Sequence, residues 1–285
     1  MIGLSPSSYY YRPKVARVER DQRDAEIRDM IEQIQGEFPR AGYRIVRAHL
    51  LRRGIRVNGK KIRRIMGLYG LRARVKRRFI RTTDSRHGHP VYPNLVEGLT
   101  VRGINQVWVA DITYIRILTG FVFLAVILDV YSRRVIGWAI AKSLERTLTL
   151  AALRMAIEQR KPPEGTIHHS DRGVQYACEQ YVGVLKEHGF QISMSAKGDP
   201  YDNAYAESFI KTLKTEEVYL WEYESFVDVV ERIPFFIEEV YNRKRLHSGL
   251  GYLPPEEFEG MLKEENADWK LGQTALIMGS KNSNA

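Results

Sequence analysis

The sequence lacks several features that define common protein classes. Cys178 is the single cysteine in 285 residues, which excludes an internal disulfide and a cysteine-rich zinc finger. No uncharged apolar run approaches the ~20 residues of a membrane-spanning helix, because the longest, Gly120 to Leu128, ends at Asp129. The opening residues MIGLSPSSYYYRPK contain no apolar signal-peptide core. These absences predict a soluble protein of a reducing compartment, the cytoplasm.

The composition is that of an ordinary globular protein with a pronounced charge asymmetry. Hydrophobic residues make up 44% and charged residues 27% of the chain, and at ~150 residues per domain the length predicts about two domains. The formal net charge is +10. Residues 1–100 hold 23 Lys and Arg against 9 Asp and Glu, whereas residues 101–285 hold 21 against 25. Because a solubilising bias need not segregate by segment, the asymmetry predicts a polyanion-binding arm joined to a body with a different task.

The arm has the pattern of three short helices. Apolar residues recur at helical spacing over 21–38, which Pro39 ends, and over 43–51, which Gly54 follows. Asn58 can cap a third helix. The expected inward residues are Ile27, Met30, Ile31 and Ile34, then Ile45, Ala48 and Leu51, then Ile62, Ile65 and Met66. Two short helices joined by a tight turn, the second of them basic, predict a helix-turn-helix.

The outward face of the third predicted helix is basic. Its residues are Lys60, Lys61, Arg63 and Arg64, and we expect them to bind DNA through its phosphates. A basic tail follows, formed by Arg72, Arg74, Lys76, Arg77, Arg78 and Arg81. A plain helical bundle would show the same helix spacing, so it is the charge that favours a DNA-binding region over residues 1–81. Residues 82–103 show little periodicity and predict a linker. Its His87 and His89 have no cysteine or carboxylate at the spacing of zinc ligands.

The body alternates strand and helix patterns. Apolar and β-branched runs predict strands over 106–118, 120–131 and 134–141, whose short connections make an antiparallel meander. Further strands are predicted over 166–170 and 191–195, between helices over 145–159, 176–188 and 203–219. This order is that of a ribonuclease-H-like α/β fold with a five-stranded mixed sheet. We expect this core to span residues 104–222, followed by a C-terminal helical extension over 223–262 and a variable tail over 263–285.

Three carboxylates in the body stand in unusual positions. Asp111 lies inside an apolar strand, where an unpaired Asp is costly, while Asp171 ends the fourth predicted strand and Glu207 lies one turn into the last helix. The strand order would bring all three to one edge of the sheet. Mg²⁺ prefers oxygen ligands, and two ions about 4 Å apart can bracket a phosphate. We therefore predict that Asp111, Asp171 and Glu207 are catalytic residues and metal ligands.

Other polar residues near these carboxylates have alternative interpretations. Asp129 also lies late in an apolar strand, where it is either a further metal ligand or the partner of Arg133 or Arg134. Asp202 and Asn203 are expected to cap the helix of Glu207. Each of these alternatives depends on contacts that the sequence alone does not define.

The last predicted helix also carries a basic face. Lys211 and Lys214 share this face with Glu207, where they either hold DNA phosphates or form ordinary surface pairs. His168 and His169 are adjacent in a strand and point to opposite faces, so at least one is expected to be structural. Cys178 is expected to be a small core residue.

At these residues the sequence resembles a known family. WVADITY, HHSDRGVQY and DNAYAESFIKTLK, with 35 residues between Asp171 and Glu207, resemble the DD(35)E core of retroviral-integrase-like transposases. The segments GLSPSSYYYR, VNGKKIRRIMGLYGLRAR and YNRKRLHSGLGYLPPEEF resemble the second-frame protein of bacterial insertion sequences of the IS-three family. The resemblance covers about residues 3 to 260. Unlike a retroviral integrase, this N-terminus cannot assemble a His-His-Cys-Cys zinc site.

The resemblance implies a DNA transposase subunit that cleaves insertion-sequence ends and transfers strands with two Mg²⁺ ions, for which Mn²⁺ is expected to substitute. It implies Asp111, Asp171 and Glu207 as the ligands and Lys214 as a DNA contact. The implied partners are double-stranded DNA carrying terminal inverted repeats, target DNA, further copies of the chain, and the upstream-frame protein or its fusion, because no sustained heptad repeat occurs here. We expect it to act on nucleoid DNA in the bacterial cytoplasm, away from membranes. A ribonuclease-H-like nuclease without strand transfer and a DNA-binding regulator with a silent core are the alternatives.

Overall fold

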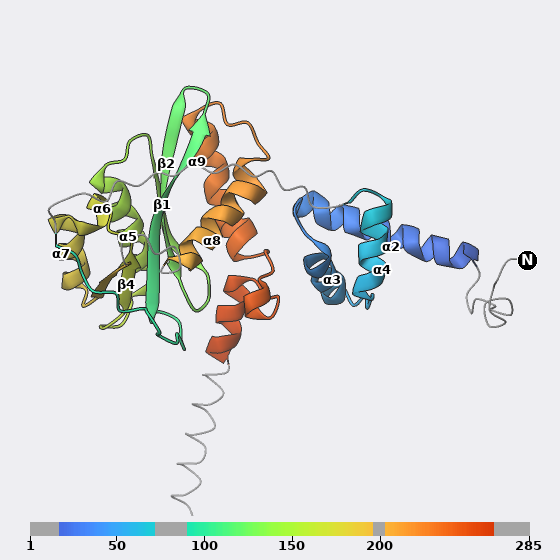
Figure 1. Ribbon diagram of the computed structural model, residues 1–285, viewed down its shortest axis with the longest axis horizontal. Helices are drawn as coiled ribbons and strands as arrows, with labels where there is room; N and C mark the ends of the chain where they lie inside the picture. The colour runs from blue at the N-terminus through green and yellow to red at the C-terminus, as the bar shows by residue number, and fades with distance from the viewer. Residues whose placement is uncertain (1–16, 72–89, 196–202, 265–285) are drawn as a thin grey trace, which may run out of the picture. The chain divides into compact units, whose positions relative to one another are not determined.

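The computed structural model describes residues 17–71, 90–195 and 203–264 (Figure 1). The chain divides into two compact units, Met1–Val75 and Lys76–Ala285. Within the described ranges, no helix combines the length and the apolar character that crossing a membrane requires.

In its described residues, 17–71, the first unit holds three helices around a small apolar core. They are α2 (Arg17–Glu37), α3 (Tyr43–Arg52) and α4 (Gly59–Leu68). Asn58 caps α4, because its Oδ1 accepts a hydrogen bond from the backbone N–H of Lys60 at 2.8 Å. The fully buried side chains include Ile31, Ile34, Val46, Leu50, Ile62 and Ile65. The predicted cap and the predicted inward face of the third helix are confirmed.

The buried face of α3 differs from the prediction. Val46 and Leu50 are fully buried, whereas Leu51 is 54% exposed and Ile45 is only partly buried. Two adjacent apolar stripes run along this helix, and both satisfy helical spacing. The contacts of α3 with α2 and α4 decide which stripe is buried. The spacing of apolar residues within one helix carries no information about these contacts.

The second unit is built on a five-stranded mixed sheet in the order β3-β2-β1-β4-β5. The strands are β1 (Val107–Ile117), β2 (Gly120–Asp129), β3 (Val135–Ala141), β4 (Ile167–Ser170) and β5 (Gln191–Met194). β1, β2 and β3 form the predicted antiparallel meander, and β4 and β5 add in parallel on the other side of β1. The predicted fold class is confirmed.

Helices cover both faces of this sheet (Figure 1). One layer holds α5 (Arg146–Arg160), α6 (Val174–Ala177) and α7 (Glu179–Glu187), which pack on alternate β1 residues such as Trp108 and Ala110. The opposite layer holds α8 (Ala204–Leu213), the π-helix η1 (Lys214–Val218), α9 (Phe226–Phe235) and the π-helix η2 (Phe236–Asn242). Because β2 is buried on both faces, its sequence is a nearly continuous apolar run.

Two predicted helices are interrupted in the structure. The helix predicted over 176–188 is broken at Cys178, whose extended backbone (φ −70°, ψ 148°) separates α6 from α7. The helix predicted over 203–219 continues from α8 into η1 with a π-helical turn. Helical periodicity predicts where apolar residues face the core, but it does not reveal a single residue that leaves the helical conformation.

The segments on either side of the predicted core also pack against the sheet. In the predicted linker, the backbone N–H of Leu95 donates to Ser193 Oγ at 2.9 Å, next to β5 residue Met194. In the predicted C-terminal extension, Asn242 both donates to Val135 O at 2.9 Å and accepts from Val135 N–H at 3.0 Å. These contacts cover β5 and the edge strand β3, so residues 90–103 and 223–242 contribute to the second unit.

Candidate active site

Asp111 lies in the middle of β1, on the face that carries α8. Val107 and Val109, which alternate with it along the strand, belong to the core beneath that helix. The Oδ1 atom of Asp111 accepts a hydrogen bond from the backbone N–H of Ile112 at 2.7 Å. β4 pairs with β1 only as far as Val109. The edge of β1 is therefore no longer covered by β4 where Asp111 stands, which leaves room for a carboxylate in an otherwise apolar strand.

Asp171 directly follows β4. The parallel register pairs Val109 with His169, so two residues further along each strand Asp171 comes beside Asp111. Its Oδ1 accepts a hydrogen bond from the backbone N–H of Gly173 at 2.9 Å. A Cβ on Gly173 would crowd the same oxygen. The turn after β4 thus fixes this carboxylate at the sheet edge.

Glu207 lies in the exposed first turn of α8. Asn203 occupies the N-cap position, but its side chain makes no capping hydrogen bond. Instead its Nδ2 donates to the carbonyl oxygen of Ala110 at 3.2 Å, so the start of α8 is attached to β1 one residue before Asp111. The prediction that Asn203 caps this helix is therefore wrong, because its side-chain amide donates to a backbone carbonyl of the sheet instead. Asp202 lies outside the described residues.

These three carboxylates interact electrostatically. Burial and the negative charges of Asp171 and Glu207 raise the pKa of Asp111 to about 7, while the N–H of Ile112 and the ammonium of Lys214 act in the opposite direction. Like charges affect each other this way only at short range. Asp111 in β1 therefore senses the charge of Asp171, which follows β4, and of Glu207 in α8.

Lys214 and Lys211 differ in their surroundings. The Nζ of Lys214 lies 4.7 Å from the centroid of the Tyr114 ring, and the side chain is partly buried. Burial lowers the pKa of Lys214, and the charge of Asp111 opposes this effect. Lys211, one turn earlier on α8, is exposed. Lys214 thus approaches the carboxylates, and Lys211 points to solvent.

The donor set fits Mg²⁺ by its chemistry. Among the residues that the structure describes, no three His, Cys, Asp or Glu side chains are grouped closely enough to hold an ion as they stand. Nevertheless, the repulsion that raises the pKa of Asp111 is what a divalent cation would relieve. Carboxylate oxygens are also the ligands that Mg²⁺ prefers.

Asp129 has a structural role. Its carboxylate accepts hydrogen bonds at 2.6–3.0 Å from the backbone N–H groups of Asn105, Tyr131 and Ser132. Arg160 Nη2 lies 3.6 Å from Asp129 Oδ2. Of the two interpretations of this residue, the structure supports ion pairing, with an arginine of α5 as its partner instead of an arginine of the β2–β3 turn.

The two adjacent histidines are also buried on opposite faces of β4. His168 Nε2 lies 2.9 Å from the hydroxyl of Tyr181, and His169 Nδ1 lies 2.8 Å from Ser193 Oγ. Burial lowers the pKa of His168 to about 3, so this imidazole is neutral. Both imidazoles are thus buried and hydrogen-bonded within the unit. Cys178 is 1% exposed and belongs to the core, as predicted.

In the N-terminal unit, two of the four predicted DNA-binding residues are engaged elsewhere. Lys61 and Arg64 form ion pairs with the buried Asp24 of α2, at 3.0 Å for Lys61 Nζ. Lys60 is exposed, and the Arg63 guanidinium lies 4.2 Å from the centroid of the Tyr43 ring. The expectation that all four point freely outward is therefore corrected for Lys61 and Arg64. Asp24 was missed because it lies within a helical stretch with many exposed charges.

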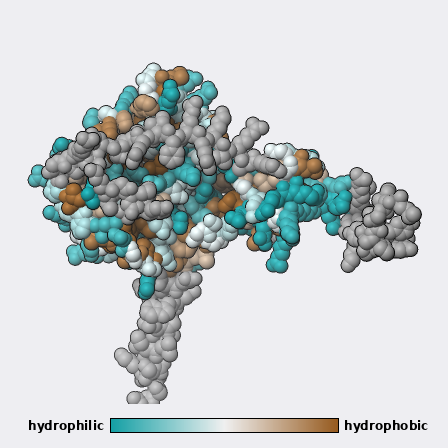
Figure 2. Space-filling model, in the orientation of Figure 1, coloured by the Kyte–Doolittle hydropathy of each residue, from teal (hydrophilic) through white to brown (hydrophobic). Residues whose placement is uncertain are grey.

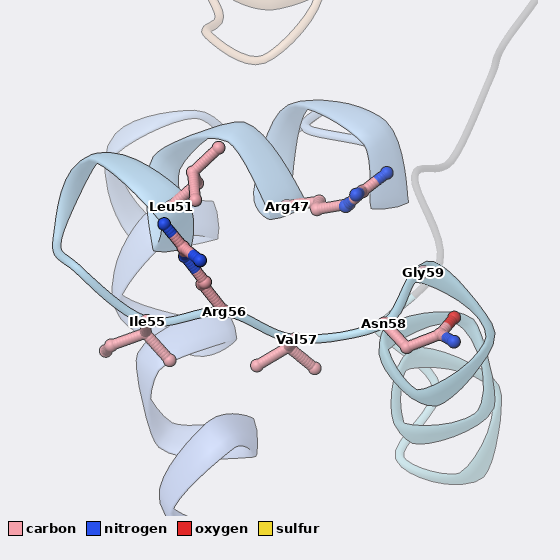
Figure 3. Close-up of a pocket in the computed structure, with 7 residues that line it drawn as sticks. All are labelled: Arg47, Leu51, Ile55, Arg56, Val57, Asn58 and Gly59. Atoms are coloured by element: carbon pink, nitrogen blue, oxygen red, sulfur yellow. The ribbon is translucent and has the colours of Figure 1, made fainter.

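An open hollow of about 570 Å³ lies between α3 and the start of α4 (Figure 3). Its lining consists of Arg47, Leu51, Ile55, Arg56, Val57, Asn58 and Gly59. Two arginines thus border an apolar floor beside the N-terminus of α4. On the face shown in Figure 2, the N-terminal unit is largely hydrophilic. The predicted basic tail from Arg72 to Arg81 lies outside the described residues, as do His87, His89 and residues 265–285.

Comparison with known proteins identifies the family. Two family models described as integrase core domain match residues 102–200 and 188–255, and an HTH-like domain model matches residues 19–79. The chain is 37% identical over 260 residues to the insertion element IS600 uncharacterized 31 kDa protein of Shigella sonnei, covering 90% of this chain and 96% of that protein. It is 35% identical over 249 residues to the transposase for insertion sequence element IS904 of Lactococcus lactis, covering 87% and 97%. The chain belongs to the IS3 family of transposases.

A further relative agrees with this assignment. The chain is 42% identical over 207 residues to the transposase InsF for insertion sequence IS3A of Escherichia coli, covering 72% of each. Among solved structures, the catalytic core domain of BIV integrase matches with a TM-score of 0.43 and 16% identity, covering 58% of this chain and 99% of that chain. As an IS3-family transposase, the chain is a DDE polynucleotidyl transferase, and DNA transposition is the activity of its family. The predicted family and enzyme class are confirmed.

Proposed function

We propose that this IS3-family transposase cleaves DNA at the ends of an insertion sequence and joins the freed strands to target DNA. The observation that supports this is that Asp111 in β1 responds to the charge of both Asp171, which follows β4, and Glu207 in α8. Asp111, Asp171 and Glu207 would hold two divalent Mg²⁺ ions, for which Mn²⁺ would substitute. When bound, Mg²⁺ supplies charge stabilisation for the attacking and leaving oxygens of a phosphodiester.

The chain's own residues provide position and charge. In the first step a water oxygen forms a bond to phosphorus, and the P–O bond to the 3′ oxygen breaks to leave a 3′ hydroxyl. In the second step that hydroxyl oxygen attacks a target phosphodiester in line and forms a new P–O bond, while the P–O bond to the target strand's own 3′ oxygen breaks and leaves there a 3′ hydroxyl. Both steps need the same stabilisation of phosphate charge, so one constellation serves both. Neither needs a covalent enzyme intermediate. Lys211 and Lys214 would contact phosphates beside the reacting bond.

The N-terminal unit would recognise the terminal inverted repeats. Lys60 is exposed and Arg63 lies over the Tyr43 ring, while Arg47 and Arg56 border the hollow beside the N-terminus of α4 (Figure 3). Lys61 and Arg64 would contribute charge while they also fix α4 on α2. In this proposal the DNA-binding region spans residues 1–81 and the catalytic core begins near residue 104.

The proposal includes partners. Transposition joins two element ends, so at least two copies of the chain would assemble on double-stranded DNA, together with the upstream-frame protein or its fusion. In this proposal the protein would act on bacterial nucleoid DNA in the cytoplasm.

The test is a cleavage and strand-transfer assay on duplexes that carry the element's own ends, with and without Mg²⁺. Asp171→Asn and Glu207→Gln are expected to abolish both products while DNA affinity stays within a few-fold, because each removes a charge that holds metal. Glu158→Gln is the matched control, since Glu158 is an exposed carboxylate on α5 in the opposite layer. Mg²⁺ should also raise the melting temperature of the wild type and of Glu158→Gln, but not that of Asp171→Asn.

Three outcomes would contradict the proposal in different ways. Cleavage by Asp171→Asn would remove the three-carboxylate assignment. Cleavage without joined products would indicate a ribonuclease-H-like nuclease. Metal-independent binding without any product, even when the upstream protein or the fusion is added, would indicate a regulator with a silent core.

A further inference from the structure

Arg133 lies in the turn between β2 and β3 in a backbone conformation that side chains rarely adopt. Its φ is +59°, in the left-handed region that favours glycine. Asp129 holds this turn from both sides. Its carboxylate accepts hydrogen bonds from the backbone N–H groups of Tyr131 and Ser132, and its backbone N–H donates to Arg134 O at 2.9 Å. Surrounding structure thus maintains a conformation that costs free energy, and such positions concentrate at functional sites.

Two other elements build a cradle for the Arg133 side chain. The guanidinium carbon lies 5.0 Å from the centroid of the Tyr205 ring at the start of α8. Gly249, in the short 3-10 helix η3 (Ser248–Leu250), also lies against the guanidinium. A Cβ on Gly249 would lie 2.9 Å from Arg133 Nη2 and 3.1 Å from Cζ. The absence of a side chain at Gly249 therefore makes the space that the guanidinium occupies.

The charge of Arg133 is not neutralised within the described part of the chain. No carboxylate there forms an ion pair with it, and none of its N–H groups donates to an acceptor. Other arginines of this unit behave differently: Arg134 and Arg160 share Glu259, and Arg245 binds Glu216 through two hydrogen bonds of 2.8 and 2.9 Å. Arg133 is thus a positioned fork of donors, opposite which none of the described residues places an anion.

The cradle lies on the helix that carries the candidate active site. Tyr205 is 40% exposed and precedes Glu207 by two residues on α8. The exposed face of α8 that joins Tyr205 and Glu207 also carries Ser208 and Lys211. Neither is a large apolar side chain, so neither would exclude a polyanion. A DNA backbone on this helix face would meet Lys211 and Arg133 with the carboxylates at its edge.

We propose that Arg133, cradled between Tyr205 and Gly249, binds a backbone phosphate of the DNA substrate. This rests on the proposed function of the α8 site. A planar guanidinium matches a phosphate with two parallel hydrogen bonds, and its cation–π contact leaves those donors free. The ligand of Arg133 is a phosphodiester and not a base edge. The cradle positions a single guanidinium and offers no second side chain that could distinguish one base from another.

The test combines protein variants with uncharged phosphate analogues in the full chain. The probe is a labelled duplex with the element's end, in which single phosphates around the cleavage point are replaced in turn by methylphosphonate. Binding is measured by fluorescence anisotropy for the wild type, Arg133→Gln, Arg133→Lys and Gly249→Ala. Arg154→Gln is the matched charge control on the exposed side of α5, and Gly183→Ala is the matched glycine control, with open space around it.

Arg133→Gln is expected to weaken binding about tenfold at low salt and to reduce the slope of log affinity against log salt by about 0.9. One or two methylphosphonate positions should weaken the wild type but have no further effect on Arg133→Gln. Gly249→Ala should reproduce part of the loss, because its methyl displaces the guanidinium without removing charge. Arg133→Lys should keep the salt slope and lose part of the affinity, and the two controls should match the wild type.

The same interference pattern in the wild type and Arg133→Gln would overturn the proposal. So would a lowered melting temperature for Arg133→Gln with unchanged DNA affinity, since that would make the cradle purely structural. Because the readout is binding, a wild type that binds but does not cleave would contradict the proposed function and leave the Arg133 site standing. A wild type that cleaves with no Arg133 effect would do the reverse.

Discussion

At the scale of single residues, the folded state requires His168 to be neutral. This histidine of β4 is 1% exposed, and its ring lies among Tyr176, Tyr181 and Phe190. Burial, with a smaller contribution from neighbouring His169, lowers its pKa to about 3 from 6.5. The unfolded chain therefore binds a proton at this side chain between these two pH values, and the folded chain does not.

His168 thus makes stability dependent on pH in the acid range. Its contribution is fully present above pH 6.5 and is lost at about 1.4 kcal/mol per pH unit as the pH falls towards 3. We expect the free energy of unfolding of His168→Gln to fall less than that of the wild type between neutral pH and pH 5, by about 2 kcal/mol. Urea unfolding at a series of pH values measures this difference.

Tyr181→Phe is the control, because it removes the hydrogen bond to His168 while it leaves the imidazole in place. It should lower stability at every pH by about 1–3 kcal/mol and keep the slope of the wild type. Equal slopes for His168→Gln and the wild type would mean that this histidine does not titrate on unfolding.

Asp111 and Asp129 show why sequence spacing identifies candidates and does not assign them. Both interrupt apolar strands. Asp129 is surrounded by three N–H donors and Arg160, whereas Asp111 accepts one N–H and faces two further carboxylates. Arg160 and the two further carboxylates come from distant parts of the chain, so the difference between the two roles is absent from the local sequence.

At the scale of elements, the attachment of α8 to β1 determines where Glu207 stands. Asn203 makes this attachment through Ala110, next to Asp111. We expect Asn203→Ala to lower the rate of end cleavage at saturating DNA about ten- to a hundredfold, because displacement of a reacting group by about 1 Å costs this much. DNA affinity should change little, since no DNA-binding charge is lost. Single-turnover cleavage at increasing protein concentration separates the two effects.

Thr212→Ala is the matched control on the same helix, because the Thr212 hydroxyl bonds only to Ser208 O within α8. It should cleave like the wild type. Asn203→Asp should not restore the rate, since it lacks the amide donor that Ala110 O requires. An Asn203→Ala protein that cleaves at the wild-type rate would show that other contacts hold Glu207 in place.

Element boundaries also show what local patterns contain. The five strands lie within about two residues of the predicted ranges, since alternation and β-branched runs are local signals. The break at Cys178 and the π-helical turn at Lys214 were missed, because helical periodicity continues through both positions. Glu216 and Glu217 in η1 bind Arg245 and Arg232, which come from later in the chain.

At the scale of the whole molecule, the two units have separate apolar cores. Ile31 is fully buried in the first unit and Leu124 in the second. We expect Ile31→Ala to destabilise the N-terminal unit by about 2–5 kcal/mol. Specific binding to element ends should be lost, while the Mg²⁺-dependent rise in melting temperature of the catalytic unit remains. Differential scanning calorimetry with and without Mg²⁺ tests this expectation.

Leu124→Ala gives the reciprocal test. It should weaken the catalytic unit and leave binding of element ends by the N-terminal unit intact. Loss of both transitions together in either variant would indicate that the two units unfold as one.

The sequence by itself determined the charge segregation, the strand order, the helix cap at Asn58 and the choice of Asp111, Asp171 and Glu207 as candidates. These depend on residue type and local spacing, which a chain carries whether or not it is folded. Only the tertiary structure decided that Lys61 and Arg64 pair with Asp24, that Asn203 ties α8 to β1, and that Arg133 is held between Tyr205 and Gly249. Each of these contacts joins residues far apart in the chain, and packing alone brings them together.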